Sequence, residues 1–104
     1  MSDSEFDTSR IDETIHGRLR LGIMAFLSAL DSATFAEIKQ KTGSSDGNLS
    51  VHLRKLEEAG YVAIVKRFVD RKPQTRAALT EAGRQAWLAY LDQLRQLIGD
   101  QTST

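Results

Sequence analysis

The fold is decided by residues 34–65, which read TFAEIKQKTGSSDGNLSVHLRKLEEAGYVAIV. Thr34 and Glu37 have the spacing of a capping box, in which each side chain accepts a hydrogen bond from the other residue's backbone N–H at a helix start. Gly43 suits the left-handed conformation that ends many helices. The pattern predicts a short helix that begins after Thr34 and ends at Gly43.

A second helix begins a few residues later. Residues 44–48 offer several N-cap side chains. Leu49, Leu53 and Leu56 follow at spacings of four and three, which places them on one helix face. We therefore expect a helix over about 46–59. Two short helices joined by about three residues that include a glycine are typical of a helix-turn-helix.

The period of the sequence then changes from helical to nearly two. Residues 61–69 are rich in β-branched and aromatic side chains, residues 70–73 form a turn cluster, and residues 74–79 provide a second strand. This predicts a two-stranded hairpin with a basic tip. A last helix over 81–98 carries an apolar stripe, and Gly99 is expected to end it.

The first helix is expected over about 12–30, where apolar residues recur at steps of three and four. Residues 1–10 read as a flexible acidic tail, residues 11–99 as one domain and residues 100–104 as a polar tail. The element order predicts a mainly α fold with a minor β part. It is a winged helix-turn-helix with an appended C-terminal dimerisation helix, in the order α-α-α-β-β-α.

Composition argues against several classes of site. The 104 residues include no Cys and two His, so thiolate metal sites, Cys nucleophiles and disulfides are not expected. No Gly-rich phosphate loop or metal motif appears, and we expect no enzyme, no cofactor and no metal. The longest apolar stretch, residues 21–30, is too short to cross a bilayer, and the acidic start lacks a signal-peptide pattern. A cytoplasmic protein is expected.

The formal net charge of zero is a cancellation between two segments. Residues 66–76 hold five basic side chains and one acid, a local balance of +4. The first fifteen residues hold five acids and one Arg, a balance of −4. A flexible acidic tail leaves the hairpin free to attract phosphate, whose neutralisation releases counterions.

The outward face of the helix over 46–59 mixes small and hydrogen-bonding side chains with one Arg, which suits the floor of a major groove. Asn48 is expected to read adenine, and Arg54 guanine or phosphate. Asp46 either reads cytosine or stabilises the helix dipole, and the second role is favoured. The predicted DNA contacts are Ser45, Asn48, Ser50, Val51, Arg54 and Lys55 from the helix, with Lys66, Arg67, Arg71, Lys72 and Arg76 from the hairpin.

A second copy of the chain is the expected partner, because so small a core tends to bury extra apolar helix surface in a two-fold dimer. The sequence leaves open whether the last helix packs on its own domain or on another chain. The predicted dimer residues are Ile15, Leu19, Trp87, Tyr90, Leu91, Leu94, Leu97 and Ile98. His52 is expected to be structural, and His16 to be a surface or dimer residue.

A family resemblance is carried most specifically by residues 47–62, GNLSVHLRKLEEAGYV, and further by residues 71–75, RKPQT, by residues 35–38 and 79–84, and by Arg20-Leu21 with Ile23 and Leu27. The chain resembles the MarR/ArsR-like winged-helix transcriptional regulators, and in particular a family of small winged-helix DNA-binding domains, over about residues 15–98. The resemblance implies a homodimeric repressor or activator on a pseudo-palindromic operator. Metal-sensing relatives use Cys, so metal sensing is not implied here. MarR-like relatives often bind small apolar molecules, and an effector stays open but unidentified.

The leading hypothesis is therefore sequence-specific binding of double-stranded DNA for transcriptional control. The alternative is a winged-helix protein–protein interaction module, whose basic hairpin docks an acidic partner without binding DNA. An enzyme is the weakest of the three readings, because two separated His without Cys cannot supply a nucleophile, a base and an orienting group.

Overall fold

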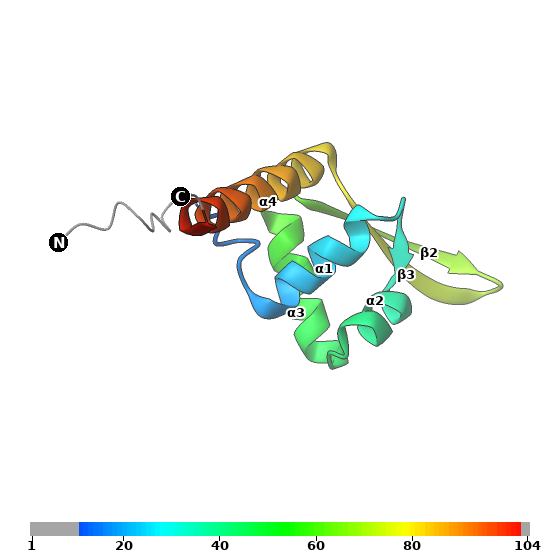
Figure 1. Cartoon of the computed structure of the whole chain (residues 1–104). Coiled ribbons are helices and arrows are strands. Elements are labelled where there is room, and N and C mark those ends of the chain that lie inside the picture. Colours follow the sequence, from blue (N-terminus) through cyan, green and yellow to red (C-terminus); the bar gives the residue numbers. More distant parts are fainter. Residues whose placement is uncertain (1–10, 103–104) are drawn as a thin grey trace.

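The computed structural model describes residues 11–102, so the predicted acidic tail lies outside the described residues. In chain order the elements are α1 (Arg18–Ser28), β1 (Ala33–Thr34), α2 (Phe35–Thr42), α3 (Asp46–Glu58), β2 (Val62–Val69), β3 (Lys72–Leu79) and α4 (Glu81–Thr102). The helices pack together, and the β2–β3 hairpin projects away from them (Figure 1). The predicted mainly helical fold with a minor sheet is confirmed, with β1 as an additional element.

Helix α1 is shorter than predicted and begins at Arg18. Gly17 is extended, with φ −163° and ψ 143°. Before it, Asp12 Oδ1 accepts a hydrogen bond from the Thr14 backbone N–H at 2.9 Å, which favours a turn over a helix. The Tyr61 hydroxyl donates to Asp12 Oδ2 at 2.6 Å. Residues 11–17 are therefore placed by distant side chains and not by helical periodicity.

The predicted helix-turn-helix is confirmed, including its caps. Thr34 Oγ1 accepts from the Glu37 backbone N–H at 3.1 Å, and Glu37 Oε1 accepts from the Thr34 backbone N–H at 2.8 Å. Gly43 ends α2 at φ 69°. Ser45 Oγ then accepts from the Asn48 backbone N–H at 3.2 Å and starts α3. The two partners in each cap lie within four residues of each other, so the sequence is enough to find them.

The sheet has the strand order β1-β3-β2 and is antiparallel throughout. Strand β1 pairs Ala33 with Ala77 and Thr34 with Arg76. The sequence predicts only a short connection at Ala33, because a two-residue strand carries too little periodicity to be seen. By pairing there, β1 attaches the hairpin to the helix-turn-helix.

The hairpin turn is tighter than the predicted cluster of residues 70–73. Asp70 and Arg71 both have positive φ, 52° and 68°, as in a two-residue hairpin turn of type I′. Strand β3 therefore already includes Pro73, which lies opposite Phe68. Strand β1 ends short of this position, so one edge of β3 is free there, and the missing N–H of proline costs no ladder bond on that edge.

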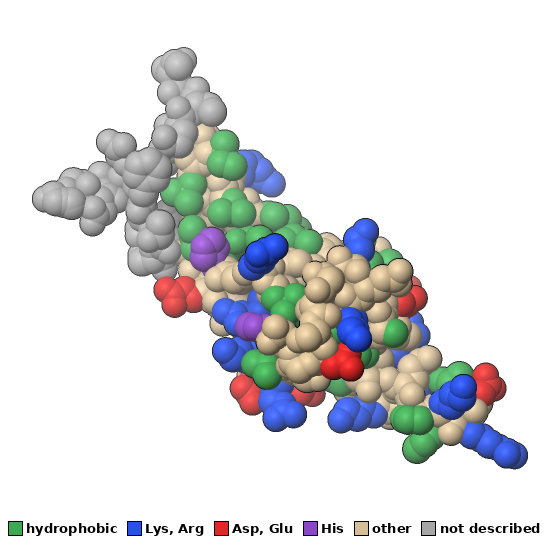
Figure 2. All heavy atoms as spheres, turned by 90° about the horizontal axis from the view of Figure 1, so that it is seen from below, with side chains coloured by type: hydrophobic (Ala, Val, Ile, Leu, Met, Phe, Trp, Pro, Cys, Tyr) green, Lys and Arg blue, Asp and Glu red, His purple; other side chains and the backbone are tan. Residues whose placement is uncertain are grey.

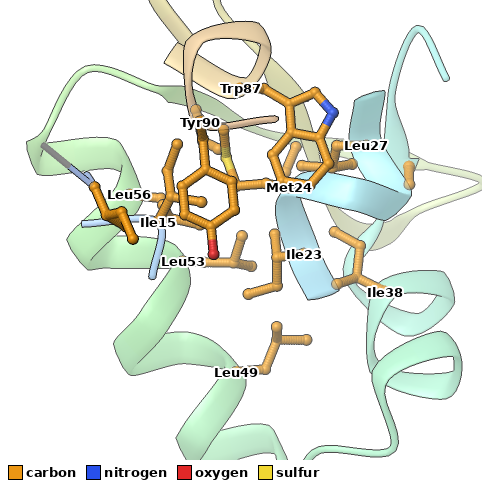
Figure 3. Packing of buried hydrophobic residues seen from close by; sticks show 14 residues of the cluster. Ile15, Ile23, Met24, Leu27, Ile38, Leu49, Leu53, Leu56, Trp87 and Tyr90 are labelled. Atoms are coloured by element: carbon orange, nitrogen blue, oxygen red, sulfur yellow. The ribbon is translucent and has the colours of Figure 1, made fainter. Parts of the chain in front are cut away.

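The core lies between α1, α3 and α4, with α2 closing one side (Figure 3). Leu49, Leu53 and Leu56 of α3 point inward, as their spacing predicts. Trp87 and Tyr90 of α4 stack on each other, with ring centroids 5.9 Å apart. The inward leucines leave the opposite face of α3 open to solvent.

Helix α4 continues to Thr102 and passes through Gly99, where the sequence predicts its end and a polar tail from residue 100. Gly99 is not among the glycines with positive φ, and one glycine inside a helix costs only about 1 kcal/mol. Within residues 11–102, no helix is long and apolar enough to cross a membrane.

Candidate nucleic-acid interface

Most of the side chains predicted to touch DNA on α3 are open to solvent. Because the three leucines of α3 face the core, the residues between them face outward. Val51 is 51% exposed. The exposed predicted contacts of α3 and its cap are Ser45, Asn48, Ser50, Val51, Arg54 and Lys55.

Two polar residues at the start of α3 have structural partners. The Ser45 hydroxyl is occupied as the helix cap. Asp46 forms an ion pair with Lys39 of α2, with 2.8 Å between Oδ1 and Nζ. Both side chains are exposed, so the pair contributes no more than about 1 kcal/mol. Lys39 offsets the negative charge that Asp46 would otherwise present to phosphate, and sequence analysis missed this partner.

Four of the five predicted cations of the hairpin are exposed, and the fifth is partly buried. Lys66, Arg67, Arg71 and Lys72 are exposed, and we call them the basic wing surface. Arg76, also a predicted contact, is partly buried and donates from Nε to Ser32 Oγ at 3.0 Å. The Arg76 guanidinium is therefore held near β1 and away from the hairpin tip.

Helix α3 and the hairpin meet in one groove. A groove of about 470 Å³ is lined by Ser50 and Arg54 of α3 together with Lys66 of β2. Glu57 of α3 lies at the same groove. Figure 2 shows Lys and Arg side chains at several points of the face seen from below, out to the far end of the hairpin. Two of the predicted helix contacts, Ser50 and Arg54, and Lys66 of the basic wing surface therefore adjoin on one side of the molecule.

A helix-turn-helix followed by a hairpin beside its second helix matches a known family model. The model described as "Winged helix DNA-binding domain" matches residues 19–98. The chain belongs to the winged helix DNA-binding domain family. The family and the fold support a DNA-binding transcriptional regulator, a class that is not normally enzymatic.

Individual relatives agree with this family. An uncharacterized protein of Methanocaldococcus jannaschii is 37% identical over 79 residues, which cover 76% of this chain and 86% of the relative. The solved structure of a transcriptional regulator homologue from Pyrococcus horikoshii OT3 is 30% identical, with a TM-score of 0.86 and coverage of 95% of this chain and 98% of that one. A MarR-family regulator from Silicibacter pomeroyi shares the fold at 20% identity and a TM-score of 0.67, with 92% of this chain on 64% of that one.

His52 connects α3 to α1. Arg20 donates from one terminal nitrogen to His52 Nδ1 at 2.9 Å and from Nε to the Thr14 carbonyl at 2.6 Å. A guanidinium can only donate, so Nδ1 accepts and the ring is neutral. Burial of the ring, followed by the charges of Arg20 and Lys55, lowers the pKa of His52 below its ordinary 6.5.

Three predicted dimer residues belong to the core of their own chain instead. Ile15 has no exposed surface, and Tyr90 is 1% exposed. Trp87 is also buried, and the Tyr90 hydroxyl shares a 2.8 Å hydrogen bond with Nδ1 of the exposed His16. The prediction is corrected for Ile15, Trp87 and Tyr90, because the winged-helix domain itself covers their side chains.

Helix α4 carries two apolar stripes that sequence analysis merged into one. Leu94 and Leu97 continue the inward stripe of the aromatic pair and are partly buried, as is Leu19 of α1. The outward stripe consists of Leu88, which is 61% exposed, and Ile98, which is 63% exposed, while Leu91 at its edge packs partly against the core. Sequence analysis missed Leu88, although its spacing of three from Leu91 is a signal of a shared face.

A cavity of about 910 Å³ lies between α1 and the α2–α3 turn. Leu19 and Phe26 contribute apolar wall, and the Lys41 ammonium lies 6.0 Å from the centre of the Phe26 ring. The cavity is large enough for a small molecule and lies beside the start of α3. Within residues 11–102, no group of three or more His, Asp or Glu side chains is placed to hold a metal ion.

Proposed function

We propose that the chain is a sequence-specific regulator of transcription that binds double-stranded DNA as a homodimer. In this proposal α3 enters the major groove and the basic wing surface lies on the flanking backbone or minor groove. Two copies related by a two-fold axis read half-sites about 10 base pairs apart, or a multiple of that spacing.

The observation that carries the proposal is the groove shared by α3 and β2. Ser50 and Arg54 present hydrogen-bonding groups from the helix, and Lys66 presents a cation from the hairpin, all at one groove. A duplex needs this combination, because base edges are read within a groove whose rims are phosphates. A cationic hairpin on another face of the molecule would not meet the same duplex.

Selection of bound duplexes from a random pool tests the proposal directly. We expect recovered sequences with two related half-sites at a fixed spacing, since a two-fold dimer presents α3 twice. Replacement Asn48→Ala is expected to change the preference among recovered sequences, because the proposal assigns Asn48 a contact with a base. A pool that shows no enrichment, together with capture of an acidic protein, would favour the protein-interaction alternative.

The basic wing surface gives a quantitative prediction. The double replacement Arg71→Ala and Lys72→Ala removes two exposed cations from the hairpin. We expect weaker binding to all duplexes by similar factors, and a log–log salt slope smaller by about 2, at roughly 0.9 per phosphate contact. Binding is measured by fluorescence anisotropy at several salt concentrations.

Arg95→Ala is the matched control, because it removes an exposed cation from α4 and not from the hairpin. It should leave the salt slope unchanged. Equal slopes for the wild type and the wing variant would place the phosphate contacts elsewhere and contradict the proposed docking.

A further inference from the structure

The tip of the hairpin carries an apolar cluster among its cations. Phe68 is 76% exposed, and the next residue, Val69, is 39% exposed on the opposite face of the strand. Pro73 lies opposite Phe68 in the strand register and is exposed as well. Apolar side chains scattered singly over a surface are ordinary, but a contiguous group marks a contact site. The hairpin therefore presents more than charge at its end.

The register places Phe68 on the face of the hairpin that meets α3. Alternate residues of a strand share a face, so Ile64, Lys66 and Phe68 point to the same side. Ile64 and Lys66 both line the groove with α3. Phe68 thus continues the floor of that groove outward, beyond the helices. Val65, which is 53% exposed, lies on the opposite face of the same strand.

The surrounding charge selects among the possible partners of this cluster. Arg67, Arg71 and Lys72 lie within four residues of Phe68 along the chain, against the single acid Asp70. Green and blue side chains gather together at the far end of the hairpin in Figure 2. The cations suit a polyanionic partner, and the apolar side chains among them suit a partner with an apolar interior. Stacked base pairs between two phosphate chains meet both conditions.

The shape of the tip also fits a narrow groove. Two strands joined by the two-residue turn Asp70–Arg71 form a thin projection. Apolar side chains that enter the minor groove wedge between base steps, and the cost of unstacking is offset by the contacts that a bent duplex permits. Steps that unstack easily, such as TA and CA, favour such an insertion.

We propose that Phe68 is a wedge that enters the minor groove beside the site read by α3 and partly unstacks one base step. Arg71 and Lys72 neutralise the phosphates on either side of that step. This inference rests on the proposed DNA-binding function. It adds a residue that selects the DNA sequence by how easily a base step deforms, and not by hydrogen bonds to bases. The chain therefore prefers flexible steps at a position that α3 does not touch.

The test uses duplexes recovered from the random pool, with the fluorescent base 2-aminopurine placed in turn at each flanking position. Wild-type protein is expected to raise its fluorescence at one position per half-site, because 2-aminopurine brightens when it unstacks. Phe68→Ala should abolish the rise and weaken binding at least about fivefold, in line with the strength of base–aromatic contacts. Phe68→Leu keeps an apolar wedge and should retain part of both effects.

Val65→Ala is the matched control, since it removes an exposed apolar side chain from the other face of β2. It should leave affinity and fluorescence unchanged. Circular dichroism melts of all variants verify that each is folded, and energy transfer between the duplex ends reports the bend.

Each of the following three outcomes would contradict the proposed insertion of Phe68. If Phe68→Ala binds as tightly as the wild type, with the same fluorescence and bend, the wedge is overturned while the proposed DNA binding stands. If the replacement instead changes the sedimentation of the free protein, the tip is a contact between copies. If the wild type binds no duplex at any salt concentration, the proposed function fails, and the wedge fails with it.

Discussion

His52 lies on α3, and protonation of its ring is coupled to folding. Its Nδ1 accepts from Arg20, and the charges of Arg20 and Lys55 face the ring. A proton on Nδ1 would remove the acceptor and place two cations in contact. Because the pKa of His52 is lowered in the folded chain, the unfolded chain binds this proton more readily.

The free energy of unfolding should therefore fall as the pH drops from above 6.5, the ordinary pKa of His52, toward its lower value in the folded chain. His52→Gln keeps an oxygen that accepts from Arg20 but does not titrate. We expect the variant to lose less stability than the wild type between pH 7.5 and pH 5.5, measured by urea unfolding. Parallel losses in both proteins would show that His52 does not contribute to the acid sensitivity.

Helix α4 depends on a close approach to the start of the hairpin. Gly83 lies in the first turns of α4, and a Cβ there would overlap the backbone carbonyl of Tyr61. The neighbouring Thr80 hydroxyl donates to the Gly60 carbonyl at 2.6 Å and accepts from the Gly83 backbone N–H at 2.9 Å. The backbone of α4 at Gly83 therefore lies directly against the backbone of Tyr61. A side chain at position 83 must push the two segments apart.

Gly83→Ala should destabilise the fold by about 2 kcal/mol, because the cost of overpacking exceeds the roughly 1 kcal/mol gained in helix propensity. Gly99→Ala in the same helix is the control, since a Cβ there would meet no atom within 4 Å. We expect it to leave stability unchanged or to raise it slightly. Urea midpoints compare the two, and equal midpoints would mean that α4 shifts on β2 at little cost.

Across the whole molecule, the outward stripe of α4 provides the surface for the proposed dimer. Leu88 and Ile98 are more than 60% exposed and lie ten residues apart, which places their side chains about 80° apart around the helix. The interface that we propose is thus narrower than the predicted one. It would contain Leu88, Leu91 and Ile98, while the aromatic pair is buried in the core of its own chain.

The double replacement Leu88→Glu and Ile98→Glu should convert the dimer to a monomer at micromolar concentration, because it places charges in a contact that depends on apolar burial. Sedimentation measures the mass. The monomer should still bind a half-site, but it should lose the preference for paired half-sites. Gln96→Glu, a charge on the polar side of α4, serves as the control. Unchanged sedimentation of the double variant would place the dimer contact elsewhere.

Local signals account for the part of this fold that sequence analysis predicts. Thr34 and Glu37 cap α2, Gly43 ends it and Ser45 caps α3, each through backbone groups no more than four residues away. The inward leucines of α3 likewise follow from helical spacing alone. These elements need no contact with a distant segment of the chain. The helix-turn-helix, the hairpin and the outward side chains of α3 therefore follow from the sequence.

The remaining features depend on contacts between distant segments. Arg76 is drawn from the basic tip by Ser32, which lies 44 residues earlier, and Asp12 is placed by Tyr61, 49 residues later. The burial of α4 is of the same kind, since both of its stripes are apolar and packing against α1 and β3 decides which one is buried. The sequence by itself determined α3 and the hairpin. Only the tertiary structure decided which cations and which apolar residues remain free for a partner, because burial is a property of all the packed elements together.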